Sequence, residues 1–123
     1  MIYLCLGYYD PDAYDLLSSQ ELEELVRTCT PLDEELHNSG ALREVASLEH
    51  RVAVSIRTRD GTISVTDGPF IESKEQVGSY FLIEARDLND AIRIASLHPA
   101  ARLGESMSWG VEIRPVERFV QEK

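Results

Sequence analysis

The spacing of apolar residues divides the chain into strand-like and helix-like segments. Residues 1–9 are rich in Ile, Leu and Tyr and are closed by Asp10-Pro11-Asp12, which predicts a buried strand followed by a turn. The next segment has the apolar spacing of three and four that is typical of one face of an amphipathic helix: Leu22, Leu25, Val26, Cys29, Leu32 and Leu36. The chain therefore begins with a strand and a long helix.

Local signals set the expected ends of this helix. Ser18 and Glu21 have the spacing of a capping box, so the helix is expected to begin near Ser19. Gly40 follows its last turn, as glycine often follows a helix. Pro31 lies within the pattern and removes one backbone hydrogen bond, which predicts a kink or break just before it.

The remaining patterns complete an α+β order of elements. Segments 42–48 and 51–59 read as strands, and Asp60-Gly61 predicts a tight hairpin that returns over residues 62–66. The later expected elements are a strand over 79–85, a helix over 88–97 capped by Asp87 and stopped by Pro99, and an edge strand over 111–119. This order predicts a ferredoxin-like α+β sandwich with an added β-hairpin and with both helices on one face of the sheet.

Length and composition favour one domain over residues 1–123. The chain has 123 residues and is 43% hydrophobic, enough for one two-layer core. No segment has the roughly 18 consecutive apolar residues of a membrane span, and the opening residues lack a leader pattern, so we expect a cytoplasmic protein with no membrane partner. One sheet face is left uncovered in this fold, which predicts a homodimer.

The charge of the chain argues against direct nucleic-acid binding. Twenty-two acidic residues against twelve basic ones give a formal net charge of -10, which repels phosphate backbones. Arg57 and Arg59 lie two apart on one predicted strand, and such a pair is suited to one phosphate or carboxylate only.

Metal and cofactor signatures are absent from the sequence. Cys5 and Cys29 fall in apolar patterns and read as reduced core residues. There is no zinc-type Cys/His grouping, nucleophilic-serine motif, phosphate-binding loop or dinucleotide glycine signature. We therefore expect no metal and no cofactor.

The polar loop from Asp67 to Gly78 is the first candidate for chemistry. Asp67, Glu72 and Lys74 lie close together around a Gly-Pro turn, and crowded carboxylates beside a lysine suit general acid/base catalysis. The alternative is structural: Asp67 caps the turn, Phe70 fills the core, and the charged side chains are solvated.

Other candidates lie outside the loop. His98 is expected at the end of the second helix, where the helix dipole favours its protonated form, as a proton-transfer residue or a helix cap. His37 and His50 read as surface residues. Tyr8 and Arg114 are candidates for ligand binding between helices and sheet, or for core-edge and interface positions.

The loop also carries a family resemblance. Its sequence DGPFIESKE, followed by Val77-Gly78, resembles the DGPF motif of the YCII-related (DGPF-domain) family. The similarity continues through YLCLGYYD, DEELHNSGAL, ARDLNDAIRIASLHP and WGVEIRPV. The resemblance implies a dimeric α/β barrel built from ferredoxin-like halves, and Asp67 matches the motif aspartate.

The resemblance implies less about function. The family has no generally established reaction, and its smaller relatives were suggested to be enzymes from a His/Asp pair in a cleft. Those relatives place the histidine on the first helix, where this chain has only His37 near the end. Family genes often lie beside those for sigma factors, which implies a sigma-factor-related protein as a partner.

Two hypotheses follow from the sequence. The first is a dimeric small-molecule-binding protein, with an acid/base site of Asp67 and His98 and with Glu72, Lys74, Tyr8 and Arg114 binding the ligand. The alternative is a non-catalytic regulatory or protein-interaction accessory linked to sigma-factor-dependent transcription.

Overall fold

A four-stranded antiparallel sheet forms the centre of the protein in a computed structural model that describes residues 1–105 and 107–122. Its strands are β1 (Ile2–Tyr9), β2 (Leu42–Ser47), β5 (Gln76–Glu84) and β6 (Gly110–Pro115), in the order β2-β5-β1-β6. The helices are α1 (Pro11–Asp15), α2 (Ser19–Asn38), α3 (Leu88–Ala95) and α4 (Pro99–Arg102). Strands β3 (Val54–Arg59) and β4 (Thr62–Asp67) form a separate hairpin.

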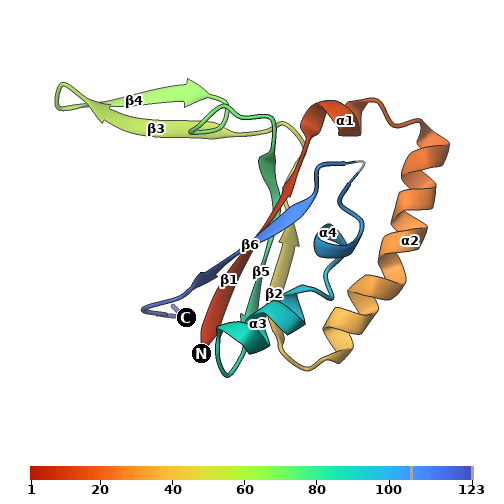
Figure 1. The fold of residues 1–123 in the computed structure, drawn as a ribbon. Coiled ribbons are helices and arrows are strands. Elements are labelled where there is room, and N and C mark those ends of the chain that lie inside the picture. The colour runs from red at the N-terminus through yellow and green to blue at the C-terminus, as the bar shows by residue number, and fades with distance from the viewer. Residues whose placement is uncertain (106, 123) are drawn as a thin grey trace.

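The helices lie on one face of the sheet (Figure 1). The sequential crossovers through α2 and α3 place β1 between β5 and β6, which is the strand order of a ferredoxin-like α+β fold. The predicted fold class and the added hairpin are therefore confirmed. Among the described residues, no helix combines the length and apolar character that crossing a membrane requires.

Helix α2 begins as its capping signal predicts. The Ser18 hydroxyl accepts from the Glu21 backbone N–H at 3.1 Å, and the Glu21 carboxylate accepts from the Ser18 N–H at 3.0 Å. The helix then runs for 20 residues with Pro31 inside it, so of the predicted kink or break, a break is absent. Gly40, with a φ of 78°, turns the chain into β2.

Pro99 starts a helix as well as following one. Helix α3 ends at Ala95, two residues earlier than predicted, and Pro99 occupies the first position of the short helix α4. A proline at this position leaves no intrahelical hydrogen bond unmade. His98 is consequently the N-cap of α4, and the prediction that it sits at a helix C-terminus that favours its protonation is wrong.

Strand β6 is shorter than predicted and ends at Pro115. It pairs only with β1 in the sheet order, so its proline stands at the end of an edge strand, as expected. The backbone N–H of Val116 still donates to the Ile2 carbonyl at 3.0 Å, and the chain then leaves the sheet.

Alternation along the strands builds the core between sheet and helices. Tyr3 and Cys5 of β1 and Phe81 and Ile83 of β5 are buried toward the helices, whereas their neighbours along each strand are partly buried or exposed. Burial raises the pKa of the Cys5 thiol to about 12, which keeps it protonated, and both cysteines are free. Cys5 is a core residue, as predicted.

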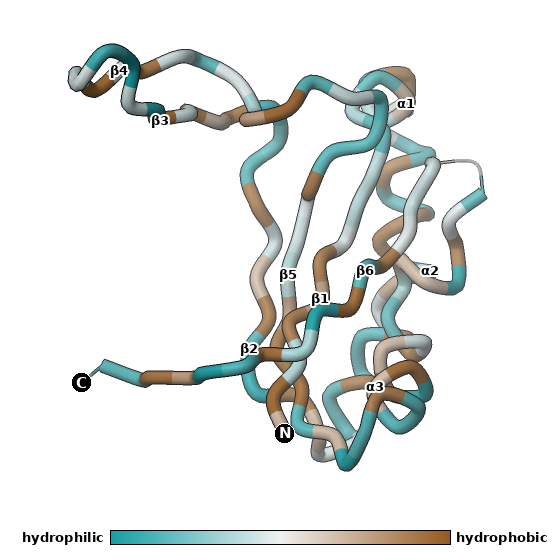
Figure 2. The backbone as a smooth tube through the Cα atoms, turned by 60° about the vertical axis from the view of Figure 1, so that its left-hand side comes forward, coloured by the Kyte–Doolittle hydropathy of each residue, from teal (hydrophilic) through white to brown (hydrophobic). Residues whose placement is uncertain are grey.

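In the part of the chain that the structure describes, no helix lies over the opposite face of the sheet (Figure 1). Leu4 and Leu82 are cross-strand neighbours at its centre, and Leu6 faces Tyr80 in the next row. The β3–β4 hairpin and the segment after β6 both project on this side in Figures 1 and 2. These apolar residues and two projecting segments define the open face.

The hairpin has the predicted tight turn and one apolar side. Asp60 and Gly61 have φ values of 52° and 77°, the conformation that an Asp-Gly turn supplies. Ile56 pairs with Val65, and together with their same-face neighbours they form an apolar strip: Val54, Ile56, Ile63 and Val65, which are 60–65% exposed.

Candidate functional site

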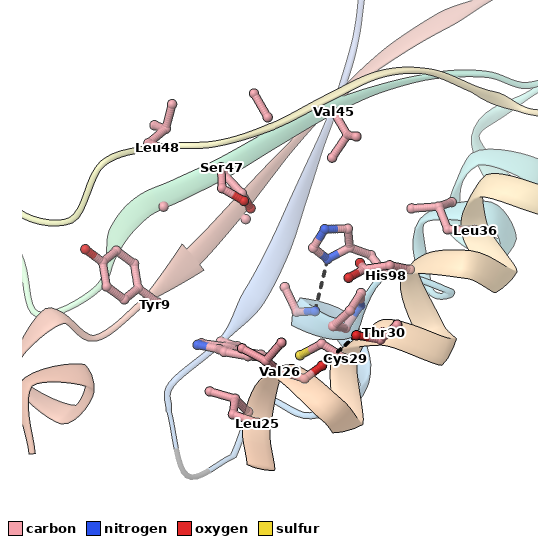
Figure 3. A pocket seen from close by; sticks show the side chains of 18 of the residues that line it. Tyr9, Leu25, Val26, Cys29, Thr30, Leu36, Val45, Ser47, Leu48 and His98 are labelled. Atoms are coloured by element: carbon pink, nitrogen blue, oxygen red, sulfur yellow. Dashed lines mark hydrogen bonds between the residues drawn. The ribbon is translucent and has the colours of Figure 1, made fainter. Parts of the chain in front are cut away.

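A cleft of about 860 Å³ lies between α2 and the sheet. Leu25, Val26 and Cys29 of α2 line one wall, and Val45 of β2 lines the other (Figure 3). Cleft-sized cavities with mostly apolar walls are the usual form of small-molecule sites.

Few charged groups reach this cleft. Within residues 1–105 and 107–122, no lysine or arginine lines it, whereas Asp33 and Glu34 of α2 do. Burial raises the pKa of the Asp33 carboxyl, because an apolar environment disfavours its charged form. The cleft therefore disfavours anionic ligands.

A hydrogen-bonded cluster centred on His50 stands at one end of the cleft. The Tyr9 hydroxyl lies 2.8 Å from His50 Nδ1, and His50 Nε2 lies 2.7 Å from Asp15 Oδ1. Arg51 donates from Nε to the other oxygen of Asp15 at 2.8 Å and from Nη2 to Asp12 at 2.5 Å. Because the carboxylate can only accept, it places the hydrogen of neutral His50 on Nε2 and leaves Nδ1 to accept from Tyr9.

The residues of this cluster come from three segments of the chain. Tyr9 ends β1, and the Asp10 side chain caps α1, which ends at Asp15. His50 and Arg51 form the turn after β2, where Arg51 has a φ of 60°. The ion pairs of Arg51 with Asp12 and Asp15 tie this unusual turn to α1.

The cluster also sets the protonation of its members. Hydrogen bonds from His50 and then from Arg51 lower the pKa of Asp15, so this carboxyl is ionised at neutral pH. Burial raises the pKa of Tyr9, so its hydroxyl keeps its proton. The Tyr14 ring packs on His50 with 4.4 Å between ring centroids. An ionised aspartate, a histidine and a protonated tyrosine in series can pass one proton.

His98 lies deeper in the same cleft. Its ring stacks on Phe81 with centroids 4.5 Å apart and planes 3° apart, and its Nδ1 accepts from the Ala100 N–H at 3.0 Å. Burial lowers the pKa of His98 to about 4, so the ring is neutral at neutral pH. His98 was predicted to be a proton-transfer residue or a C-terminal helix cap; it caps the start of α4 instead, and proton transfer by His98 stays a prediction.

Asp67 lies outside this cleft. It ends β4 opposite Val54 and is exposed. The rest of the DGPF motif folds back on the hairpin: the Gly68 carbonyl accepts from the Ser55 hydroxyl at 2.7 Å, and the Arg57 guanidinium lies 3.7 Å from the Phe70 ring centroid. Phe70 is 58% exposed, so the expectation that it fills the core is wrong.

Glu72 and Lys74 border a second cavity of about 320 Å³, which Asp12 and Arg51 also line. The loop that carries Glu72 and Lys74 thus lies near the ion pairs that Arg51 makes with Asp12 and Asp15. Neither cavity is lined by Asp67, and only the large cleft is lined by His98, so the structure does not bring these two predicted catalytic residues together at one cavity.

Tyr8 and Arg114 meet through a third residue. The Tyr8 hydroxyl donates to Glu112 Oε1 at 3.3 Å, and Arg114 Nη1 donates to Glu112 Oε2 at 3.2 Å. Tyr8 also borders the large cleft, whereas Arg114 does not. In the described part of the chain, no three His, Cys, Asp or Glu side chains gather in the manner of a metal site.

Sequence reasoning missed the His50 cluster. His50 was expected on the surface, yet its side chain is 29% exposed and paired on both nitrogens. Tyr9 and Asp15 lie 41 and 35 residues from His50 along the chain, so no local motif links them. The resemblance to a family with a His/Asp pair in a cleft was the available signal, but the pair here contains Asp15 and not Asp67.

A glycine fixes the position of Tyr9. A Cβ added to Gly78 of β5 would lie 2.6 Å from Tyr9 Cδ1, so Gly78→Ala is expected to displace the ring and break its hydrogen bond to His50. The comparison is Gly110→Ala, because a Cβ at Gly110 has nothing within 4 Å. A crystal structure of each variant measures the Tyr9–His50 distance. An unmoved ring in Gly78→Ala would contradict this prediction.

The comparisons with known proteins identify the family of the chain and leave its reaction open. The model of the YCII-related domain matches residues 1–120. An uncharacterized protein of Rhizobium meliloti (strain 1021) is 32% identical over 96 residues, which cover 77% of each chain. The match to the family model spans the strands and helices that enclose the cleft as well as the DGPF loop. The chain therefore belongs to the YCII-related family.

Proposed function

We propose that the protein is an acid/base enzyme that binds a small, largely apolar molecule in the cleft between α2 and the sheet. The observation that carries this proposal is the Tyr9–His50–Asp15 series, which opens on the cleft through Tyr9 and His50. General acid/base catalysis by a positioned side chain contributes about 10²- to 10⁴-fold to a rate.

Each member of the series has a distinct role in this proposal. His50 takes a proton at Nδ1, either from substrate or through the Tyr9 hydroxyl. Asp15 fixes the ring tautomer and stabilises the imidazolium that forms, because its lowered pKa keeps it anionic. Arg51 positions Asp15 by holding its second oxygen at 2.8 Å.

Proton transfer can be tested before the natural substrate is known. We would incubate the protein in D₂O with a panel of small apolar compounds that carry an acidic C–H bond and follow loss of that proton signal by NMR. The wild-type protein is expected to accelerate exchange for part of the panel. His50→Gln is expected to lower the accelerated rate at least about 100-fold.

The control is Glu23→Gln, because Glu23 is exposed on α2 and lines neither cavity. It is expected to keep the wild-type rate. Equal exchange by wild-type and His50→Gln protein, or no acceleration of any compound, would refute the proposal.

Two sequence predictions remain alongside this proposal. If Asp67 is catalytic, Asp67→Asn should lower the same exchange rate. Asp67 is exposed on the hairpin. A regulatory accessory that binds a sigma-factor-related protein would retain that binding in His50→Gln. The family resemblance supports this alternative, and the cleft supports the enzyme.

We also infer that the protein is a homodimer joined through its open face. Leu4, Leu6 and Leu82 form an apolar centre, and the hydrogen bonds of Tyr80 to Glu44 and of Tyr8 to Glu112 lie to its sides. An apolar centre with a polar rim is the usual anatomy of a protein interface. Two sheets packed through this face would form the α/β barrel that the resemblance implies.

A further inference from the structure

His98 presents an unused hydrogen-bond donor inside the cleft. Because its Nδ1 accepts from the Ala100 N–H, the neutral ring carries its hydrogen on Nε2. Within the part of the chain that the structure describes, no protein group pairs with this Nε2. The residue is only 9% exposed and lines the cleft, and Figure 3 shows its second nitrogen directed away from α4.

The ring is held rigidly in this orientation. Stacking on Phe81 fixes the plane of the ring, and the hydrogen bond from the Ala100 N–H to Nδ1 fixes which edge of the ring faces α4. The Nε2–H is open to the cleft, and an acceptor atom of a ligand placed there would bond to a donor that no described protein group uses. The geometry therefore calls for an acceptor atom at this end of the cleft.

The surroundings restrict the kind of acceptor. Leu36 and Val45 lie beside His98 in Figure 3, and the charged side chains that line the cleft are the acids Asp33 and Glu34. A neutral ring offers a hydrogen but no positive charge, so nothing here offsets the burial of an anion. A ligand with an uncharged oxygen acceptor on an apolar body fits the apolar walls and buries no negative charge.

We propose that His98 Nε2–H binds the carbonyl oxygen of an uncharged, largely apolar ligand whose body fills the cleft between α2 and the sheet. This inference rests on the proposed function for the identity of the site. In Figure 3, Tyr9 lies at the left of the view, apart from His98, which lies nearer to Leu36 and α2. His98 is therefore an anchoring residue, and the reacting part of the ligand lies toward Tyr9 and His50.

Three naphthalene probes separate the acceptor from the apolar body: 2-acetylnaphthalene carries a neutral carbonyl, 2-ethylnaphthalene has the same shape without it, and 2-naphthoate is anionic. Trp109 lines the cleft and is the single tryptophan of the chain, so its indole N–H signal reports binding by NMR. Dissociation constants are measured for wild-type protein and two variants of His98.

The two variants separate the acceptor at Nδ1 from the donor at Nε2. In His98→Asn the side-chain oxygen takes the place of Nδ1 and still accepts from Ala100, but nothing reaches the position of Nε2. In His98→Gln the amide reaches that position and restores a donor. Thermal unfolding of each variant verifies that it is folded before binding is measured.

The expected result is selective. His98→Asn weakens binding of 2-acetylnaphthalene about tenfold and changes binding of 2-ethylnaphthalene less than about twofold, whereas His98→Gln retains ketone binding. For wild-type protein, 2-naphthoate binds at least about tenfold more weakly than the ketone. Equal losses for both neutral probes, preferred binding of naphthoate, or no binding of any probe below about 1 mM would each overturn the inference.

These outcomes are separable from failure of the proposed function. Ketone selectivity that depends on His98, without proton exchange that depends on His50, supports this inference and refutes the enzyme. Exchange that depends on His50, without ketone selectivity, supports the enzyme and refutes this inference.

Discussion

The free energy of unfolding is expected to fall by roughly 3 kcal/mol through His98 alone as the pH drops from about 6.5 to about 4. Burial lowers the pKa of folded His98 to about 4, whereas an unfolded histidine titrates near 6.5. Between these values the unfolded chain binds a proton that the folded protein does not. Unfolding then takes up a proton, so acid favours it; above about pH 6.5 this contribution to stability is complete.

Urea unfolding of wild-type protein and His98→Asn at a series of pH values measures this effect. Carboxylates also titrate in this range, so the informative quantity is the difference between the two proteins. His98→Asn is expected to be less stable at pH 7, because it loses the stack on Phe81, but to show a shallower fall with acid. His37→Asn, at an exposed position of α2, should follow the wild-type curve, and parallel curves for all three proteins would contradict the prediction.

Leu82→Glu is expected to convert a homodimer into a monomer. Leu82 faces Leu4 at the centre of the open face, and a two-fold axis through this face would bury two copies of the new carboxylate. Burying an unpaired charge costs several kcal/mol, so association should weaken roughly a thousand-fold or more. Light scattering at micromolar concentration gives the mass of each protein.

The fold of the variant should survive, because Leu82 is only partly buried in the single chain. Circular dichroism verifies this. Leu16→Glu introduces the same charge at a position that is 84% exposed, after α1, and should remain dimeric. A monomeric wild-type protein, or a dimeric Leu82→Glu variant, would show that the open face is not the interface.

Local patterns in the sequence determined most of the architecture. Three features act over a few residues each and can be read without a structure: the capping box of Ser18 and Glu21, the helical spacing of the α2 apolar residues, and the Asp60-Gly61 turn. Of the kink or break predicted at Pro31, a break is absent, because α2 continues past one missing hydrogen bond. Helix α3 ends before Pro99 as predicted, but α4, which begins at this proline, was missed because proline both ends and begins helices.

The candidate site was determined by tertiary structure. Tyr9, Asp15 and His50 come from a strand end, a short helix and a turn, and only the pairing of β2 with β5 and of β5 with β1 brings those segments together. The sequence identified the loop after Asp67 because its polar residues are adjacent in the chain. Nearness in the sequence shows that side chains are crowded but not whether they are buried, and the structure places Asp67 on an exposed hairpin.

The charge state of His98 shows the same division. Its place before Pro99 was evident from the sequence and suggested a protonated ring at a helix end. Its neutrality follows from burial against Phe81 of β5 and from capping α4, neither of which its sequence neighbours encode. The sequence by itself determined the elements and the family resemblance, because these depend on short-range pattern. The tertiary structure decided which side chains share a cleft and which of them are charged, because burial and hydrogen bonding act between segments distant in the chain.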